Sequence, residues 1–136
     1  MSARGRARRR ALDILFEAEQ RDTDPMDGVT SRRTSTEQVI NPYTVEIING
    51  VVSEQERIDE ILSSYAQGWT LDRMPAVDRS ILRIGAWELL FNDDVPDGVA
   101  VAEAVTIARE LSTDASPEFV NGLLGRIQQL KPTLLD

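Results

Sequence analysis

One segment in the second half of the chain is apolar almost all the way round a helix, and this feature constrains the fold most. The segment begins after Pro75 and extends to about Leu90. A helix without a polar face is stable only when other elements cover it on every side. It is therefore predicted to be the centre of the core, through Val77, Ile81, Leu82, Ile84, Ala86, Trp87, Leu89 and Leu90.

The segments that cover this helix are also predicted to be helical. Apolar residues recur at spacings of three and four, and strand-like alternation never persists. Asn41 and Ser116, each followed by proline, are predicted N-caps, and Pro132 is predicted to end the last helix. The four further helices expected from these patterns span about residues 6–20, 41–66, 99–111 and 116–131.

The polar stretch from residue 21 to residue 40 leaves two structures open. Asp24 and Pro25 offer a cap and a first-turn residue, whereas Gly28 weakens any helix that follows. A short helix and a loose crossing loop are equally compatible with it. The chain has 136 residues, 41% of them apolar, which is enough for one core. The fold class predicted is all-α, a single domain of six or seven helices.

The cations are concentrated in the first ten residues. MSARGRARRR contains five arginines and no acid, so the other 126 residues hold 10 cations and 23 acids, +5 against −13 in a chain of net charge −8. Cations at the front of a helix oppose its macrodipole, so they do not help this helix to form. Because arginine pairs with phosphate and stacks on unpaired bases, single-stranded RNA is the predicted ligand. A basic tail that aids solubility is the alternative.

Phe119 is the second candidate for RNA contact. It lies outside the apolar stripe of the last helix, which would leave its ring free for base stacking, although partial burial explains a single phenylalanine equally well. The ring is expected to lie near the arginine segment in space. The other aromatic residues near helices and turns are assigned to packing, and they are Tyr43, Tyr65, Trp69 and Trp87.

The composition disfavours catalysis and membrane insertion. The chain has no cysteine and no histidine, so thiolate chemistry, the commonest general base and the commonest metal ligand are missing. Its carboxylates form no metal-loop or phosphate-binding motif. No apolar run is long enough to span a bilayer, and no apolar signal region follows the N-terminal arginines. A cytoplasmic, non-enzymatic protein without cofactor, metal or membrane partner is expected.

Four stretches, in this order and spacing, resemble the NusB transcription antitermination family. They are RGRARRRALDILFEAE, AVDRSILRIGAWELLFNDDVP, VAVAEAVTIARELST and SPEFVNGLLGRI, and the last contains the family's FVNG at residues 119–122. The resemblance covers nearly the whole chain. It implies one NusB-like RNA-binding domain over residues 1–136, arranged as two small helical bundles at about 6–66 and 70–131.

The resemblance also implies a function. Members of this family bind the boxA segment of nascent ribosomal RNA together with NusE, which is ribosomal protein S-ten, and act on the transcription elongation complex. Carried over by position, the implied RNA contacts are Arg4, Arg6, Arg8, Arg9, Arg10 and Phe119.

The implied NusE-facing patch consists of Phe16, Asp72 and Asp78, where acidic groups would suit a basic ribosomal protein. Core burial for Phe16 and a first-turn carboxylate role for Asp78 explain these two residues equally well. The chain departs from the family pattern at Ala115, where an acidic residue is common, and in lacking a clear second helix.

Two other functions stay open at this stage. One is a helical protein-interaction module that never touches RNA, with the acidic body as its working surface. The other is the RNA-binding module of an RNA-modification system, although no glycine-rich cofactor-binding segment follows the helical region. A homodimer that hides the arginine segment is also compatible with the sequence.

Overall fold

The computed structural model describes residues 2–35 and 39–135. In these residues the backbone forms six helices and no strand, so the all-α prediction is confirmed. The helices are α1 (Ala3–Arg21), α2 (Pro25–Ser35), α3 (Pro42–Tyr65), α4 (Ala76–Phe91), α5 (Asp97–Leu111) and α6 (Ser116–Leu134).

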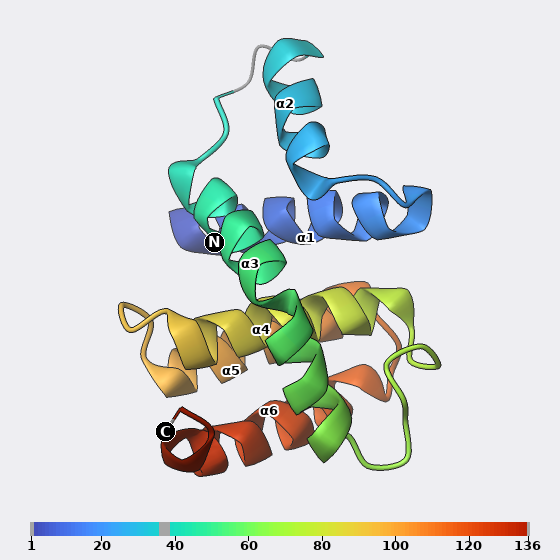
Figure 1. Cartoon of the computed structure of the whole chain (residues 1–136), viewed down its shortest axis with the longest axis vertical. Helices are drawn as coiled ribbons and strands as arrows, with labels where there is room; N and C mark the ends of the chain where they lie inside the picture. The colour runs from blue at the N-terminus through green and yellow to red at the C-terminus, as the bar shows by residue number, and fades with distance from the viewer. Residues whose placement is uncertain (1, 36–38, 136) are drawn as a thin grey trace.

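The longest helix, α3, connects two groups of helices. Figure 1 shows α1 and α2 at one end of the molecule, α4, α5 and α6 at the other, and α3 running from the first group to the second. α4 packs against α1, α3, α5 and α6, which confirms that the apolar segment after Pro75 is the central helix. Because α3 contacts both groups, the division into bundles at residues 66–70 stays a prediction.

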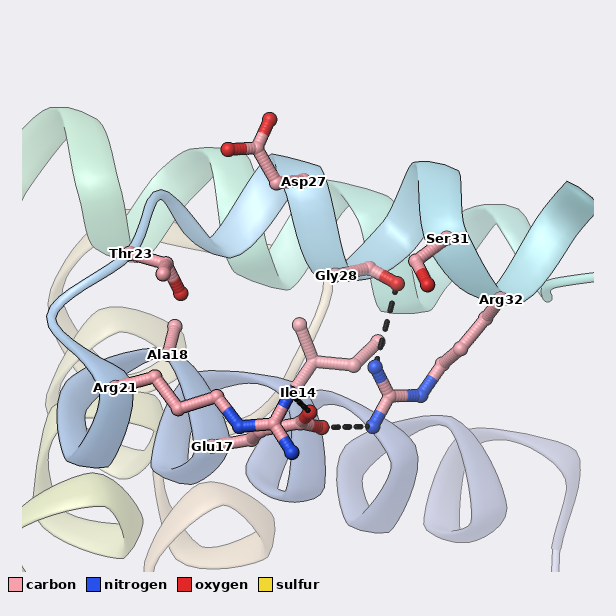
Figure 2. Close-up of a pocket in the computed structure, with 9 residues that line it drawn as sticks. All are labelled: Ile14, Glu17, Ala18, Arg21, Thr23, Asp27, Gly28, Ser31 and Arg32. Carbon is pink, nitrogen blue, oxygen red and sulfur yellow. Dashed lines mark hydrogen bonds and ion pairs between the residues drawn. The ribbon is translucent and has the colours of Figure 1, made fainter. Parts of the chain in front are cut away.

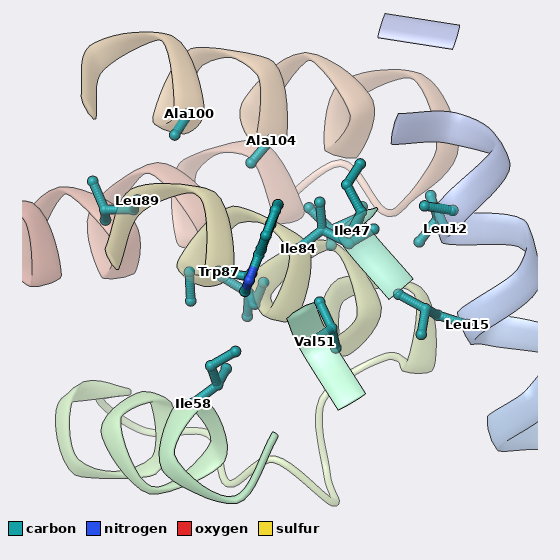
Figure 3. Close-up of a cluster of buried hydrophobic side chains, with 14 of the residues drawn as sticks. Leu12, Leu15, Ile47, Val51, Ile58, Ile84, Trp87, Leu89, Ala100 and Ala104 are labelled. Carbon is teal, nitrogen blue, oxygen red and sulfur yellow. The ribbon is translucent and has the colours of Figure 1, made fainter. Parts of the chain in front are cut away.

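The core is continuous between the two groups of helices. Leu12 and Leu15 on α1 meet Ile47 and Val51 on α3, and the cluster continues past α4 to α5 (Figure 3). Within it Trp87 of α4 lies against the backbone of α3 at Gly50, where an added Cβ would stand 2.0 Å from the indole nitrogen. Gly50 is therefore needed for the close approach of α3 to α4.

Two of the capping signals in the sequence, Asn41 and Asp24, cap helices in the structure. The Asn41 side chain accepts a hydrogen bond from the Tyr43 backbone at 2.9 Å, and Asp24 accepts one from the Met26 backbone at 2.9 Å. The Asp24 cap favours a helix in the polar stretch, and α2 is that helix. Its Val29 is fully buried and its Met26 packs against the core, so two apolar side chains hold a helix that has almost no apolar stripe.

Two predictions about α6 are wrong. The helix continues through Pro132 to Leu134, because proline in the last turn costs only one backbone hydrogen bond. The predicted N-cap Ser116 lies inside the helix, and its hydroxyl donates a hydrogen bond to Asp78 on α4 at 2.8 Å. That hydroxyl therefore joins α6 to α4.

A polar cleft lies between α1 and α2. Figure 2 shows Glu17 on its floor, within 3.0 Å of Arg21 and 2.8 Å of Arg32. A Cβ at Gly28 would stand 3.1 Å from Ile14, so glycine lets α2 approach α1 here. Glu17 and Arg21 are both on α1, whereas Arg32 is on α2. The ion pair between Glu17 and Arg32 therefore links the two helices across the cleft.

Candidate nucleic-acid interface

The helical register of α1 divides the predicted arginine segment into two faces. The helix begins at Ala3, earlier than predicted, because the Ser2 hydroxyl accepts a hydrogen bond from the Gly5 backbone at 2.9 Å. All five arginines therefore lie on a regular helix. Arg4 and Arg8, four residues apart, are directed towards α3 and α4, whereas the other three arginines lie on the remaining faces.

Arg6 and Arg10 share the face of the segment that lines a cleft. They are four residues apart, Arg6 exposed and Arg10 half-buried, and both line an open cleft. The rest of this cleft is formed by small or polar residues of α1 and of the chain leading into α3, which are Ala3, Ala7, Val39, Asn41 and Thr44. Among the residues that the structure describes, no acidic side chain lines this cleft, so an anion that enters it would lie beside two guanidinium groups.

Arg9 lies on the side of α1 that faces α5. Its guanidinium forms an ion pair with Glu110, which is half-exposed at the end of α5. Its Nε atom is buried and has no hydrogen-bond partner within the described part of the chain. One of the predicted RNA contacts, Arg9, is therefore paired with a carboxylate of the acidic part of the chain.

Arg8 is placed differently from the prediction. Its side chain is 4% exposed, and its Nε donates to the two carboxylate oxygens of Glu88 at 2.8 and 3.0 Å. Burial alone lowers the pKa of this guanidinium, but the hydrogen bond and negative charge of Glu88 outweigh burial and raise it. Arg8 is therefore a charged residue inside the fold, and the surface available to RNA lies on the other arginines.

Arg4 is held over an aromatic ring. Its guanidinium carbon lies 4.6 Å from the ring centroid of Tyr43, within the range of a cation–π contact. The Tyr43 hydroxyl donates to Glu88 and accepts a hydrogen bond from Asn92 at 3.1 Å. Burial, followed by the hydrogen bond to Glu88, raises the pKa of Tyr43 far above its ordinary value of 10.0. Tyr43 therefore stays a neutral hydrogen-bond donor.

Phe119 does not stand alone at the start of α6. Its half-buried ring packs on Trp69, with centroids 5.4 Å apart and planes tilted by 37°. Trp69 was assigned to packing, yet 42% of it is exposed. Its position beside Gly68, which ends the α3 region with a positive φ, was the signal that this ring lies in a surface turn.

Phe119 and Arg4, the first arginine of the segment, lie towards different ends of α4, so the expected closeness does not extend to Arg4. Arg4 contacts Tyr43, whose hydroxyl meets Asn92 at the C-terminal end of α4, whereas α6 begins beside Asp78 at the N-terminal end. These ends are separated by the length of α4, on the order of 20 Å. The reason is topological: α1 runs antiparallel to α4, so the end of α1, not its start, lies near the beginning of α6.

The three residues of the predicted partner patch have different surroundings. Asp78 is 1% exposed and accepts hydrogen bonds from the hydroxyls of Ser112 and Ser116, so its carboxylate is not on the surface. Phe16 is half-buried and Asp72 is exposed. The hydrogen bond from the Thr70 side chain is the main cause that lowers the pKa of Asp72, which stays negatively charged.

Phe16 and Asp72 are nevertheless at the same end of the molecule. Glu19, one turn after Phe16, pairs with Arg79, and the same guanidinium donates to the carbonyl of Leu71, the neighbour of Asp72, at 2.6 Å.

A metal site and a membrane span are both missing from the part of the chain that the structure describes. No cluster of acidic side chains there could bind a metal ion, and none of its helices combines the length and apolar character of a membrane span.

Comparison with known proteins identifies the family. The model of the NusB family matches residues 5–129, which is most of the chain. The chain belongs to the NusB family. It is 70% identical to the transcription antitermination protein NusB of Arthrobacter sp. (strain FB24), over 99% of both chains. It is 58% identical to that of Beutenbergia cavernae, over 100% of this chain and 95% of the relative.

Solved structures agree with the family assignment. T. maritima NusB superposes with a TM-score of 0.81 at 32% identity, over 95% of this chain and 92% of that one. The complex of the antitermination factors NusB and NusE with double-stranded RNA matches with a TM-score of 0.81 at 24% identity, over 94% and 98% of the two chains, and supports the fold. The NusB-like fold implied by the four sequence stretches is confirmed.

Proposed function

We propose that this protein is a transcription antitermination factor that binds boxA-type RNA of nascent ribosomal transcripts together with NusE. The observation that carries the proposal is the arginine face of α1, formed by Arg6, Arg9 and Arg10 in a chain of net charge −8. Its relatives are named transcription antitermination protein NusB, and a structural neighbour is a complex of NusB, NusE and RNA. The protein acts by binding in the cytoplasm, within the elongation complex, and catalyses no reaction.

RNA is bound at two separated places in this proposal. Arg6 and Arg10 contact phosphates in their cleft, and Arg9 joins them after leaving Glu110. Phe119 and the exposed face of Trp69 accept a stacked base. Because on the order of 20 Å separate the two places, a single strand in an extended conformation reaches both. A compact hairpin docked on α1 alone would miss the aromatic pair.

NusE docks at the opposite end of α1 in this proposal. Phe16 and Asp72 supply an apolar contact and a surface charge there for a basic partner. Asp78 contributes indirectly, since its hydrogen bonds to Ser112 and Ser116 hold the α5–α6 connection against α4. RNA and NusE then occupy different surfaces, and both can be bound at the same time.

A matched pair of double variants tests the RNA site. Arg6→Ala with Arg10→Ala removes two cations from the cleft, and Arg33→Ala with Arg73→Ala removes two exposed cations elsewhere. The first should weaken binding of a boxA RNA and lower the slope of log affinity against log salt by about 0.7 for each lost phosphate contact. The second should leave the slope unchanged. Equal losses in both variants would indicate nonspecific charge attraction, and unchanged affinity in the first variant would indicate a pure protein-interaction module.

A further inference from the structure

Glu88 is a buried carboxylate in the helix that the sequence makes most apolar. It is 1% exposed, and its oxygens accept hydrogen bonds from Arg8 of α1 and from the hydroxyl of Tyr43 of α3. Asn92 completes the group by donating to the Tyr43 oxygen at 3.1 Å. One carboxylate of α4 therefore joins the beginnings of two other helices.

A buried ion pair usually stabilises a fold no more than a well-packed apolar contact in its place. What the pair adds is a fixed direction, because the Nε–H group of Arg8 points between the two oxygens of Glu88 and hydrogen bonds weaken when they bend. The start of α1 has a second directional contact, since the Thr44 hydroxyl donates to the Ala7 carbonyl at 3.0 Å. Together these bonds fix both the rotation of α1 about its axis and its position along α3.

That rotation decides which arginines reach solvent. Successive residues turn by about 100° in an α-helix, so fixing Arg8 towards Glu88 turns Arg6 and Arg10 away from the core and directs Arg9 along the side of α5, towards Glu110. The first turn of α1 contains no acidic residue, and its cations oppose the helix dipole. Without the Glu88 anchor this end of the helix has electrostatic reasons to fray.

We propose that Glu88 and Tyr43 are positioning residues for RNA binding: by anchoring Arg8, they fix α1 so that Arg6, Arg9 and Arg10 face the RNA. This inference rests on the proposed RNA-binding function. It gives Arg8 an indirect role, as the residue through which the anchor acts. It also explains a buried charge in the middle of an apolar helix.

The test compares Glu88→Gln with Glu103→Gln in a titration of a boxA RNA at two salt concentrations. Both substitutions remove one negative charge near Arg8, but Glu103 is a half-exposed residue 3.8 Å from it and is no anchor. Glu88→Gln should weaken RNA binding about tenfold and lower the slope of log affinity against log salt. This loss is expected even though removing a negative charge would by itself favour RNA binding. Glu103→Gln should bind equally or more tightly.

Hydrogen exchange on the same variants reports the position of α1. Amides of residues 3–10 should exchange faster in Glu88→Gln and not in Glu103→Gln, with α5 and α6 unchanged in both. If Glu88→Gln does not fold, Tyr43→Phe replaces it, because that substitution removes one hydroxyl and keeps the ring beneath Arg4. Its RNA affinity should fall about threefold, with faster exchange at the start of α1.

Unchanged or tighter RNA binding by Glu88→Gln, or by Tyr43→Phe in its place, would overturn the positioning role, because Glu88 would then only compete with RNA for Arg8. The Arg6→Ala and Arg10→Ala double variant, measured in parallel, separates this failure from a failure of the proposed function. If that double variant loses affinity while the anchor variant does not, only the positioning role is wrong. If neither loses affinity, the RNA site itself is wrong.

Discussion

At the scale of single residues, Glu19 has the most concentrated electrostatic surroundings. It accepts hydrogen bonds from Arg79 at 2.9 Å and from Arg83 at 2.6 Å, and Arg83 also pairs with Asp59 on α3 at 2.8 Å. One carboxylate at the end of α1 thus joins α1 to α4, and through Arg83 to α3. The hydrogen bond from Arg79, helped by Arg83, lowers the pKa of Glu19 below its ordinary value of 4.5 despite partial burial.

This shift predicts a pH dependence of stability. A carboxylate whose pKa is lower in the folded state stabilises the fold above its unfolded pKa, and this stability is lost as pH falls through the folded pKa. Wild-type protein should therefore be more stable than Glu19→Gln at pH 7, and the difference should shrink below pH 4.5. Denaturant unfolding across this range measures it, with the exposed Glu46→Gln as control. A difference that stays constant with pH would contradict the assignment.

The ion pair between Arg9 and Glu110 predicts a variant with increased RNA affinity. Glu110 pairs with the guanidinium of Arg9, which is part of the proposed RNA site. Removing that carboxylate in Glu110→Gln should therefore let the protein bind a boxA RNA more tightly. A half-exposed pair is worth at most about 1 kcal/mol, which limits the gain to about fivefold. Fluorescence anisotropy at low salt measures this gain. Weaker binding by Glu110→Gln would show that Glu110 orients Arg9 for RNA instead of competing with it.

The inward direction of Arg8 could have been predicted from the sequence. Arg8 lies three residues before Ala11 and four before Leu12, which places it on the buried apolar face of the first helix. What could not be predicted is the partner. Glu88 lies 80 residues away, and nothing local distinguishes it from a surface carboxylate.

At the scale of helices, the crossing of α3 and α4 depends on one glycine. Gly50→Ala would place a methyl group 2.0 Å from the Trp87 indole, which is 6% exposed and cannot move without disturbing the core. Overpacking of this kind costs about 1–3 kcal/mol. Gly125→Ala on α6 is the matched control, because nothing lies within 4 Å of its added Cβ. Chemical denaturation should show a loss for Gly50→Ala alone, and equal stabilities would contradict the packing argument.

The helices themselves were largely predictable, and their exceptions have local causes. The apolar periodicity and the cap at Asn41 predict their helices, whereas α2 has the Asp24 cap but almost no apolar stripe for a periodicity argument to detect. Pro132 is a strong stop signal that fails because the helix has only its last turn left. Ser116 is a residue type that often caps helices, but its hydroxyl donates a hydrogen bond to Asp78. This tertiary contact cannot be predicted from the spacing of residues in the sequence.

At the scale of the whole molecule, the direction of α1 relative to α4 determines how the surfaces are distributed. Because the two helices are antiparallel, the arginine face and the Phe119–Trp69 pair lie at opposite ends of α4, while Phe16 and Asp72 lie near the end of α1. The sequence predicts candidate RNA contacts, of which Arg8 is buried, but their separation depends on tertiary topology. The proposed RNA site is therefore a track along the molecule, and extended RNA is its expected ligand.

The most direct measurement of the central claim is a binding titration with two RNAs, one containing boxA and one with the same bases scrambled. Each is measured with and without NusE at two salt concentrations. The account predicts tighter binding of boxA RNA, a further gain with NusE, and weaker binding at high salt as phosphate contacts are screened. Equal affinity for both RNAs under every condition would contradict the claim, because only nonspecific charge would then remain.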